Sequence, residues 1–342
     1  MKILYALQGT GNGHIARARD LVPRFAEHAT VDVLIAGVNS TLGLGFPVKY
    51  NRYGLAMVYN DQGSVSYWKS LFKNRIFQFL KDVVTLPVQD YDLVIIDFEA
   101  ITSYACKLRG VKALQLSHQA AYWSPKSPRP SIKVLHWEWV LRFMSPAKHA
   151  LGFHFQPYDK FILPPIIRQE VRQLNPQDKG FYCVYLPSYS GDQLQEFLQR
   201  FESERFLIFS STFPERPVPS NLQFFKPSVS EFLNALENCT GLICGAGFEA
   251  PAEALFLGKK LLAIPIEGQY EQVCNGEALK RMGALVLPKL EPSYESEIQS
   301  LFDTEAQARV DFPDFADALV LGIVNNVLKE REYDDISSLQ VW

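Results

Sequence analysis

The stretch GLICGAGFEAPAEALFLGKKLLAIPIEGQYEQVCNGEAL, residues 241–279, carries the strongest structural signal in the chain. The apolar run at 242–244 predicts a buried strand, and the glycine-rich turn at 245–247 follows it. Apolar residues after the turn predict a helix that ends at Gly258, and LLAIPI then predicts a second buried strand. This order of strand, turn, helix and strand is typical of an α/β sheet.

The turn at 245–247 is suited to an anion. The first amide groups of a helix lack intrahelical partners and the helix dipole adds positive charge there, so a diphosphate is a natural ligand. A glycine turn is also a common connection between strand and helix, and both interpretations stay open on the turn alone. Carboxylates and amides that suit sugar hydroxyls follow in the next loop and helix: Glu267, Gln269, Glu271, Gln272 and Asn275.

The whole passage resembles the donor-binding region of GT-B glycosyltransferases, which include the peptidoglycan N-acetylglucosaminyltransferase and the UDP-glucuronosyltransferase-like enzymes. The matching positions are Gly247, Glu253, Gly258, Pro265, Glu271, Gln272 and Asn275. The resemblance implies that the Gly247 region holds the diphosphate and that Glu253 holds the ribose hydroxyls. It also implies that Glu271 and Gln272 hold the donor sugar and that UDP is the carrier.

The chain departs from this pattern beside the expected diphosphate. Many relatives have a histidine where this chain has Gly245, and Asn-Ser or Thr-Thr where it has Phe248, Glu249 and Ala250. A carboxylate at Glu249 would repel a diphosphate unless it faces away or accepts hydrogen bonds from an acceptor or sugar.

The N-terminal half begins with the strand pattern KILYALQ and the loop GTGNGH. Gly9, Gly11 and Gly13 make this acceptor-side loop flexible, and His14 stands at the start of the next helix. VDVLIAG then completes a βαβ unit. The glycine spacing is not G-x-G-x-x-G and no acidic residue ends the second strand, so a dinucleotide site is not expected.

The strand YDLVIIDFEA contains Asp97 near its carboxyl end. Because the carboxyl ends of parallel strands share one edge of a sheet, we expect Asp97 to lie towards His14. An imidazole paired with a carboxylate can take a proton near neutral pH. The resemblance gives His14 the role of base on the acceptor hydroxyl and Asp97 the role of orienting it. The alternative is a capping histidine and a solvated carboxylate.

Three further polar residues have two interpretations each. The strand KALQLSHQ brings His118 and Gln119 to the same edge, as cleft-lining residues or as structural hydrogen-bonding groups. Ser188 follows the first strand of the second half and either helps to hold donor phosphates or belongs to a plain loop. His149 and His154 have no carboxylate or cysteine cluster at ligand spacing, so no metal site is predicted.

The segment 67–84 predicts an amphipathic helix with interleaved lysine and arginine. It is interpreted as a helix that packs on the sheet, or alternatively as a surface for a lipid-linked acceptor.

At 342 residues the chain predicts two domains. We expect an acceptor-side Rossmann-like domain and a nucleotide-sugar domain, joined by a linker and followed by a helix that packs back across it. The boundaries are 1–165 for the first domain, 166–180 for the linker, 181–312 for the second domain and 313–342 for the final helix.

The composition excludes several classes of protein. Hydrophobic residues make up 47% of the chain and the net charge is −3, which argues against a nucleic-acid surface. The five cysteines form no CxxC pair and are expected to be reduced. The pattern MKILYALQG predicts a strand rather than a signal peptide, and no apolar run in the sequence reaches about 18 residues, the length expected of a membrane span. A cytoplasmic protein is expected, peripheral at the membrane if its acceptor is lipid-linked.

These observations predict the GT-B fold, two Rossmann-like α/β domains with parallel sheets that face a cleft. The expected activity is metal-independent, inverting hexosyl transfer from a nucleotide sugar, such as a UDP-sugar, to an acceptor hydroxyl, with no further cofactor. Amides at a helix N-terminus and hydroxyl groups can stabilise the leaving diphosphate, so no carboxylate-held Mg²⁺ is needed. Two alternatives stay open: a nucleotide-sugar epimerase or hydrolase of the same fold, and a non-catalytic nucleotide-sugar binding protein, which Gly245 and Glu249 suggest.

Overall fold

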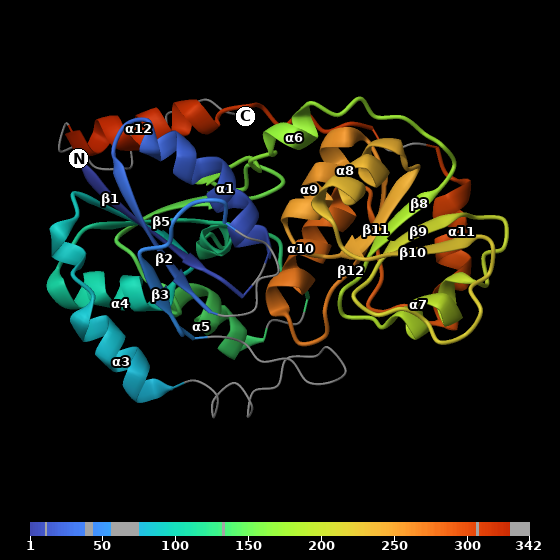
Figure 1. Cartoon of the computed structure of the whole chain (residues 1–342), viewed down its shortest axis with the longest axis horizontal. Helices are drawn as coiled ribbons and strands as arrows, with labels where there is room; N and C mark the ends of the chain where they lie inside the picture. The colour runs from blue at the N-terminus through green and yellow to red at the C-terminus, as the bar shows by residue number, and fades with distance from the viewer. Residues whose placement is uncertain (11, 38–43, 56–74, 132–133, 306–307, 329–342) are drawn as a thin grey trace.

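The computed structural model of the chain has two lobes, each built on a parallel sheet (Figure 1). It describes residues 1–10, 12–37, 44–55, 75–131, 134–305 and 308–328.

The first lobe contains a seven-stranded sheet in the order β3-β2-β1-β4-β5-β6-β7, in which every pair of neighbours is parallel. Its strands are β1 (Lys2–Gln8), β2 (Thr30–Ala36), β3 (Tyr50–Arg52), β4 (Leu93–Asp97), β5 (Ala113–Ser117), β6 (His149–Phe153) and β7 (Ile162–Leu163). Its helices are α1 (Asn12–Ala26), α3 (Ile76–Thr85), α4 (Ala100–Arg109) and α5 (Leu135–Phe143), with 3₁₀ turns η1 (Val88–Asp90) and η2 (Gln119–Trp123).

The second lobe contains a six-stranded parallel sheet in the order β10-β9-β8-β11-β12-β13. Its strands are β8 (Tyr182–Tyr185), β9 (Phe206–Phe209), β10 (Leu222–Phe225), β11 (Gly241–Gly245), β12 (Lys260–Ile264) and β13 (Leu285–Val286). Its helices are α7 (Gly191–Leu198), α8 (Val229–Asn238), α9 (Glu249–Leu257), α10 (Tyr270–Arg281) and α11 (Glu295–Asp303), with the 3₁₀ turn η3 (Pro292–Tyr294).

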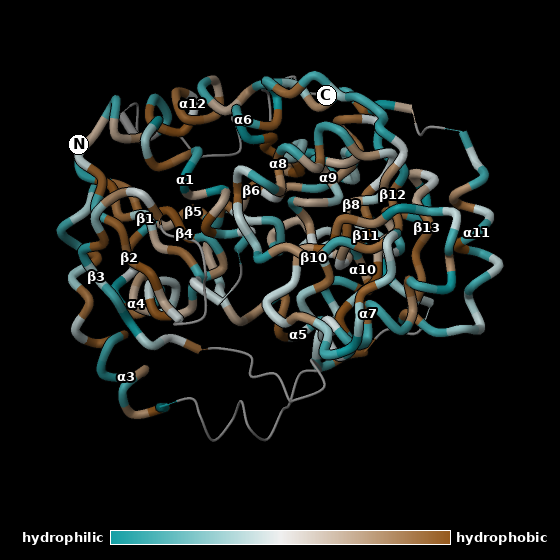
Figure 2. Tube along the Cα trace, turned by 45° about the vertical axis from the view of Figure 1, so that its right-hand side comes forward, coloured by the Kyte–Doolittle hydropathy of each residue, from teal (hydrophilic) through white to brown (hydrophobic). Residues whose placement is uncertain are grey.

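Both sheets lie inside their lobes. Strands β4, β5 and β12 are buried along their whole length, as expected for parallel strands covered on both faces. Figure 2 shows hydrophobic residues concentrated along the strands and hydrophilic residues on the outer helices. One glycine sets the packing of η2 on β6, because a Cβ added at Gly152 would lie 2.4 Å from the amide nitrogen of Ala121.

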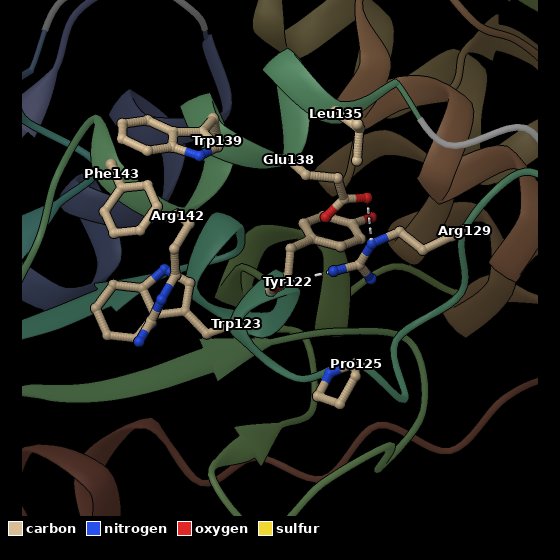
Figure 3. A pocket seen from close by; sticks show the side chains of 9 residues that line it. All are labelled: Tyr122, Trp123, Pro125, Arg129, Leu135, Glu138, Trp139, Arg142 and Phe143. Carbon is tan, nitrogen blue, oxygen red and sulfur yellow. Dashed lines mark hydrogen bonds and ion pairs between the residues drawn. The ribbon is translucent and has the colours of Figure 1, made fainter.

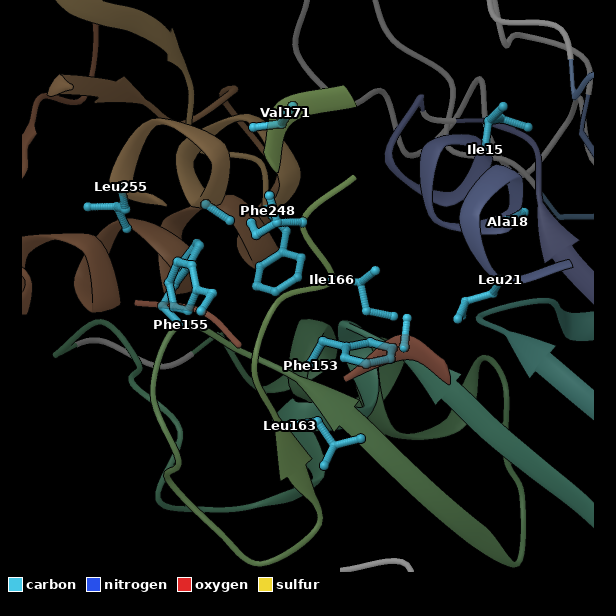
Figure 4. Close-up of a cluster of buried hydrophobic side chains, with 14 of the residues drawn as sticks. Ile15, Ala18, Leu21, Phe153, Phe155, Leu163, Ile166, Val171, Phe248 and Leu255 are labelled. Carbon is cyan, nitrogen blue, oxygen red and sulfur yellow. The ribbon is translucent and has the colours of Figure 1, made fainter. Parts of the chain in front are cut away.

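The two lobes share a hydrophobic core. It runs from α1, through Phe153 and Phe155, to Phe248 at the start of α9 (Figure 4). Helix α6 (Gln169–Arg172) lies between the lobes. After the second lobe, helix α12 (Ala316–Leu328) returns to the first and packs on α1, where Arg24 and Asp317 form an ion pair (Figure 1).

Helix α3 differs from the amphipathic helix expected over 67–84. Residues 67–74 lie outside the described residues, and the helix begins at Ile76. Its apolar side chains Ile76, Phe77, Leu80 and Val84 are exposed, whereas Asp82 is buried. Asp82 accepts a hydrogen bond from Gln78 and pairs with Arg52 of β3. This polar group lies on the inner face together with Phe79 and Val83, which pack on the core of the first lobe.

The five cysteines are all buried and free. No helix within the described residues has both the length and the hydropathy that a membrane span requires.

Candidate active site

His14 and Asp97 form a direct pair at the carboxyl edge of the first sheet. Asp97 ends β4 opposite Leu7 of β1, and His14 lies in the first turn of α1, which follows β1. The distance from His14 Nδ1 to Asp97 Oδ1 is 2.8 Å. Asp97 is completely buried, which rules out the alternative of a solvated strand-end carboxylate.

The residue after Asp97 has a strained backbone. Phe98 has a φ of 55°, in the left-handed region that bulky side chains rarely occupy. Its ring stacks on the imidazole of His14 with centroids 6.5 Å apart and planes 7° apart. Backbone strain of this kind gathers at functional sites, and here it positions a ring against the proposed base.

Arg17, one helical turn after His14, belongs to the same site and was not predicted from the sequence. It donates from Nε to Asp97 Oδ2 at 3.0 Å and from Nη2 to Asp97 Oδ1 at 3.2 Å. Its Nη1 donates to Glu249 Oε1 of the second lobe at 2.9 Å. A spacing of three residues places His14 and Arg17 on one helix face, and that spacing was the signal available in the sequence.

The pKa values of the two carboxyl groups move in opposite directions. Burial would raise the pKa of Asp97, but Arg17 and His14 outweigh it and hold that pKa below its usual value. Burial raises the pKa of Glu249 to about 7, although Arg17 opposes the shift. Asp97 is therefore a fixed anion, whereas Glu249 can change its protonation near neutral pH.

The hydrogen bond from Arg17 pairs the charge of Glu249, which the sequence places at the start of α9 near the expected diphosphate. Its carboxylate accepts a hydrogen bond from a buried guanidinium, so its negative charge is paired within the protein. Arg17 therefore offsets the repulsion between Glu249 and a nearby anion, and the sequence did not indicate this partner.

A second polar group joins the lobes at Asn275. Asn275 Oδ1 lies 2.7 Å from His118 Nε2 and accepts a hydrogen bond from the Tyr122 hydroxyl, while its Nδ2 donates to the carbonyl of Ala246 at 3.0 Å. The His118 ring stacks on Phe248 with centroids 4.0 Å apart. His118 is completely enclosed, and burial lowers its pKa.

Gln119 and Glu271 extend this contact. Gln119 Nε2 donates to Glu271 Oε2 at 3.0 Å, and His118 Nε2 lies 3.8 Å from Glu271 Oε1. Residues predicted for the acceptor side thus touch residues predicted for the donor side.

The glycine-rich turn leaves space beside the N-terminus of α9. A Cβ at Gly247 would meet no atom within 4 Å, and one at Gly245 would lie 3.6 Å from Gln272 Oε1. Phe248 is the N-cap of α9 and makes no side-chain capping bond. Gln272 accepts a hydrogen bond from the amide of Ile266, which fixes the loop after β12.

The other predicted residues have varied surroundings. Gln269 is the N-cap of α10, and Ser188 lies half-buried in the turn between β8 and α7. Gly9 donates to the carbonyl of Ala36, and a Cβ there would lie 2.8 Å from Ile35. A Cβ at Gly13 would lie 3.2 Å from Glu249 Cγ. Gly11 lies outside the described residues.

Glu253 has an internal partner that the sequence did not reveal. Arg168, just before α6, donates from Nε to Oε1 at 2.6 Å and from Nη2 to Oε2 at 2.9 Å. A ribose would therefore have to share this carboxylate with a half-buried arginine.

A pocket of about 470 Å³ lies beside α5 in the first lobe (Figure 3). Trp139 and Phe143 form one wall, and the Arg142 guanidinium lies 4.3 Å from the ring centre of Trp123. Glu138 accepts hydrogen bonds from Arg129 and from the Tyr270 hydroxyl of α10, so the pocket adjoins the contact between the lobes.

Within the described residues, no three side chains of His, Cys, Asp or Glu gather as metal ligands would.

Two parallel-sheet lobes with polar residues gathered where they meet define the GT-B fold, as expected from the sequence. Among solved structures, UGT89C1 of Arabidopsis thaliana complexed with UDP is similar, with 14% identity over 98% of each chain and a TM-score of 0.62. MurG of Acinetobacter baumannii has 13% identity over 96% of this chain and 99% of its own, with a TM-score of 0.51. A putative UDP-N-acetylglucosamine 2-epimerase of Listeria monocytogenes has 12% identity over 97% of each chain and a TM-score of 0.58. At these identities the likeness shows the fold.

Residues 1–295 match the family model for glycosyl transferase family 1, and the chain belongs to this family. It is a glycosyltransferase. A comparison with curated proteins gave no significant match.

Proposed function

We propose that this glycosyltransferase moves a hexose from a UDP-sugar to an acceptor hydroxyl, with inversion at the anomeric carbon and without a metal ion or further cofactor. The hydrogen bond of 2.8 Å between His14 and the buried Asp97 carries the proposal. Asp97 is held as an anion, so it favours His14 with its proton on Nδ1. This tautomer leaves Nε2 free to act as a base.

The step balances without another reactant. His14 Nε2 takes the proton of the acceptor hydroxyl, and the acceptor oxygen attacks the anomeric carbon from the face opposite the diphosphate. The bond from that carbon to the phosphate oxygen breaks, and the nucleoside diphosphate leaves with the electron pair. Asp97 stabilises the imidazolium that forms.

The leaving group is assigned to the turn at 245–247. Unpaired amides at the N-terminus of α9 would stabilise its charge, as a metal ion does in other transferases. The space beside Gly247 and the pairing of Glu249 with Arg17 support this placement. UDP is proposed as the carrier because the similar structure of UGT89C1 is complexed with UDP.

The acceptor is proposed to have an apolar portion. Exposed Leu135, Trp139 and Phe143 line the pocket beside α5, and Arg142 would suit a negative group on the same molecule. A lipid-linked acceptor and a small aromatic acceptor fit equally, and the activity of Trp139→Ala on each would distinguish them. Co-sedimentation of the protein with lipid vesicles tests whether the enzyme associates with the membrane surface.

Product analysis with a panel of UDP-sugars and hydroxyl acceptors, in EDTA, tests the reaction. The expected product has the opposite anomeric configuration from the donor, and His14→Ala should lower kcat by about 10²- to 10⁴-fold. Full activity in His14→Ala would exclude the mechanism, and dependence on added Mg²⁺ would exclude metal independence. Epimerised or hydrolysed UDP-sugar without an acceptor would favour the isomerase or hydrolase alternative. UDP binding with no turnover would favour a binding protein.

A further inference from the structure

Glu249 lies across the lobe boundary from the helix that carries His14. It is the first residue of α9, and its carboxylate meets Arg17 of α1, a residue 232 positions earlier in the chain. The first turn of α1 leaves room for it, because a Cβ at Gly13 would lie only 3.2 Å from Glu249 Cγ. The side chain of Glu249 therefore fits against the residue that precedes His14.

Arg17 is held in one orientation. Its side chain is 4% exposed, and its guanidinium lies 5.4 Å from the ring centre of Phe153. Two of its nitrogens bond to Asp97 and a third bonds to Glu249. Because the guanidinium is a rigid planar fork, it cannot turn away from one carboxylate without disturbing the bonds to the other.

The position of Arg17 matters to His14 directly. Arg17 Nη2 lies 3.4 Å from His14 Nδ1, so the guanidinium would repel the imidazolium that forms during proton transfer. Glu249 supplies a second anion that balances this charge. The charged groups around His14 are thus Asp97 on β4, Arg17 on α1 and Glu249 on α9, and the phenol of Tyr5 on β1 belongs to the same electrostatic cluster.

We propose that Glu249 is a positioning residue which, acting through Arg17, holds the His14–Asp97 pair in its reactive arrangement from the opposite lobe. The inference rests on the proposed function of His14 as a base. Residues of both lobes then hold His14 in its reactive position. His14 is fully positioned only when the donor lobe packs against the acceptor lobe.

The test compares the wild type with Glu249→Gln at pH 8, above the pKa of about 7 of the Glu249 carboxyl, so that the variant keeps the size of the side chain and removes its charge. We expect kcat to fall about tenfold to hundredfold, less than the 10²- to 10⁴-fold contribution of a general base itself, while the KM for the UDP-sugar changes little. Loss of the anion should also loosen the hydrogen bond between His14 and Asp97. NMR of histidine-labelled protein detects this as a shift of the His14 Nδ1 proton signal, with His14→Gln used to assign the signal.

Three further variants separate positioning from a general loss of structure. Gly13→Ala pushes on Glu249 from the other lobe and should lower kcat in the same way, whereas Glu249→Asp should recover part of it. Glu295, the first residue of α11, forms an ion pair with Arg200, which follows α7. Glu295→Gln removes one half of this pair and should change neither kcat nor the His14 signal.

An unchanged His14 signal together with an unchanged kcat in Glu249→Gln would overturn the inference. Loss of UDP binding in Glu249→Gln with normal kcat at saturation would also overturn it, because it would make Glu249 a donor-binding residue. If the wild type transfers no sugar, the proposed function fails, whereas the His14 signal still decides whether Glu249 acts on His14.

Discussion

Arg168 holds both carboxylate oxygens of Glu253, at 2.6 and 2.9 Å. Arg168 lies in the segment that joins the two lobes, and Glu253 lies in the middle of α9. The side chain of Glu253 is only 5% exposed. The pair therefore fixes the segment between the lobes to the helix whose N-terminus is proposed to bind the diphosphate.

Replacing Glu253 with alanine should destabilise the protein strongly. Removal of one partner leaves the Arg168 cation largely buried without its counterion, which typically costs about 3 kcal/mol or more. Urea denaturation measures the change in the free energy of unfolding. The double variant Glu253→Ala, Arg168→Met should lose less than the sum of the two single variants, and strict additivity would show that the two residues do not interact.

A second substitution at Glu253 tests whether this residue contacts the ribose of the donor. If Glu253 also accepts hydrogen bonds from the ribose hydroxyls, Glu253→Gln should weaken UDP binding by at least about 1.4 kcal/mol, a tenfold change in Kd, as expected for a charged hydrogen bond. Calorimetric titration of folded protein with UDP measures this. A change below about 0.5 kcal/mol would assign Glu253 to the structural pair with Arg168 alone.

Glu249 should make the stability of the protein fall as the pH rises. Burial raises the pKa of Glu249 to about 7 in the folded state, above the value near 4.3 in the unfolded state. Between these two pH values the folded protein therefore binds a proton at Glu249 that the unfolded protein does not. Stability from Glu249 is then fully present below about pH 4 and is lost as the pH rises through about 7. Denaturation at pH 5 and pH 8 should show a smaller decline in Glu249→Gln than in the wild type. Equal declines in both proteins would contradict the raised pKa.

Much of the fold could be predicted because parallel sheets are governed by local signals. Buried apolar runs such as 242–244 mark strands, and glycine-rich turns mark the passage to a helix. The pairing of His14 with Asp97 followed from one rule, that the carboxyl ends of parallel strands share an edge.

The features that could not be predicted depend on contacts between segments that lie far apart in the sequence. Nothing near Glu249 or Glu253 in the sequence indicates that Arg17 and Arg168 bind them, since these partners lie 232 and 85 positions away. The left-handed backbone of Phe98 depends on packing around it, and no residue preference predicts it. In α3, apolar spacing indicated an inner face that includes Phe79, but it did not reveal that Asp82 is buried there and pairs with Arg52.

His154 should make the protein sensitive to acid. It is completely buried, its Nδ1 accepts a hydrogen bond from the amide of Phe155, and burial holds its pKa well below the usual value. The histidine must then be neutral in the folded state, so its contribution to stability is present above about pH 6.5 and is lost as the pH falls. Between pH 7 and pH 5, the dependence of unfolding free energy on pH should be flatter in His154→Phe than in the wild type, by up to about 1.4 kcal/mol per pH unit. The exposed His28 provides a matched control, because His28→Phe should leave this slope unchanged. An unaltered slope in His154→Phe would show that another buried group, such as His118, governs the response to acid.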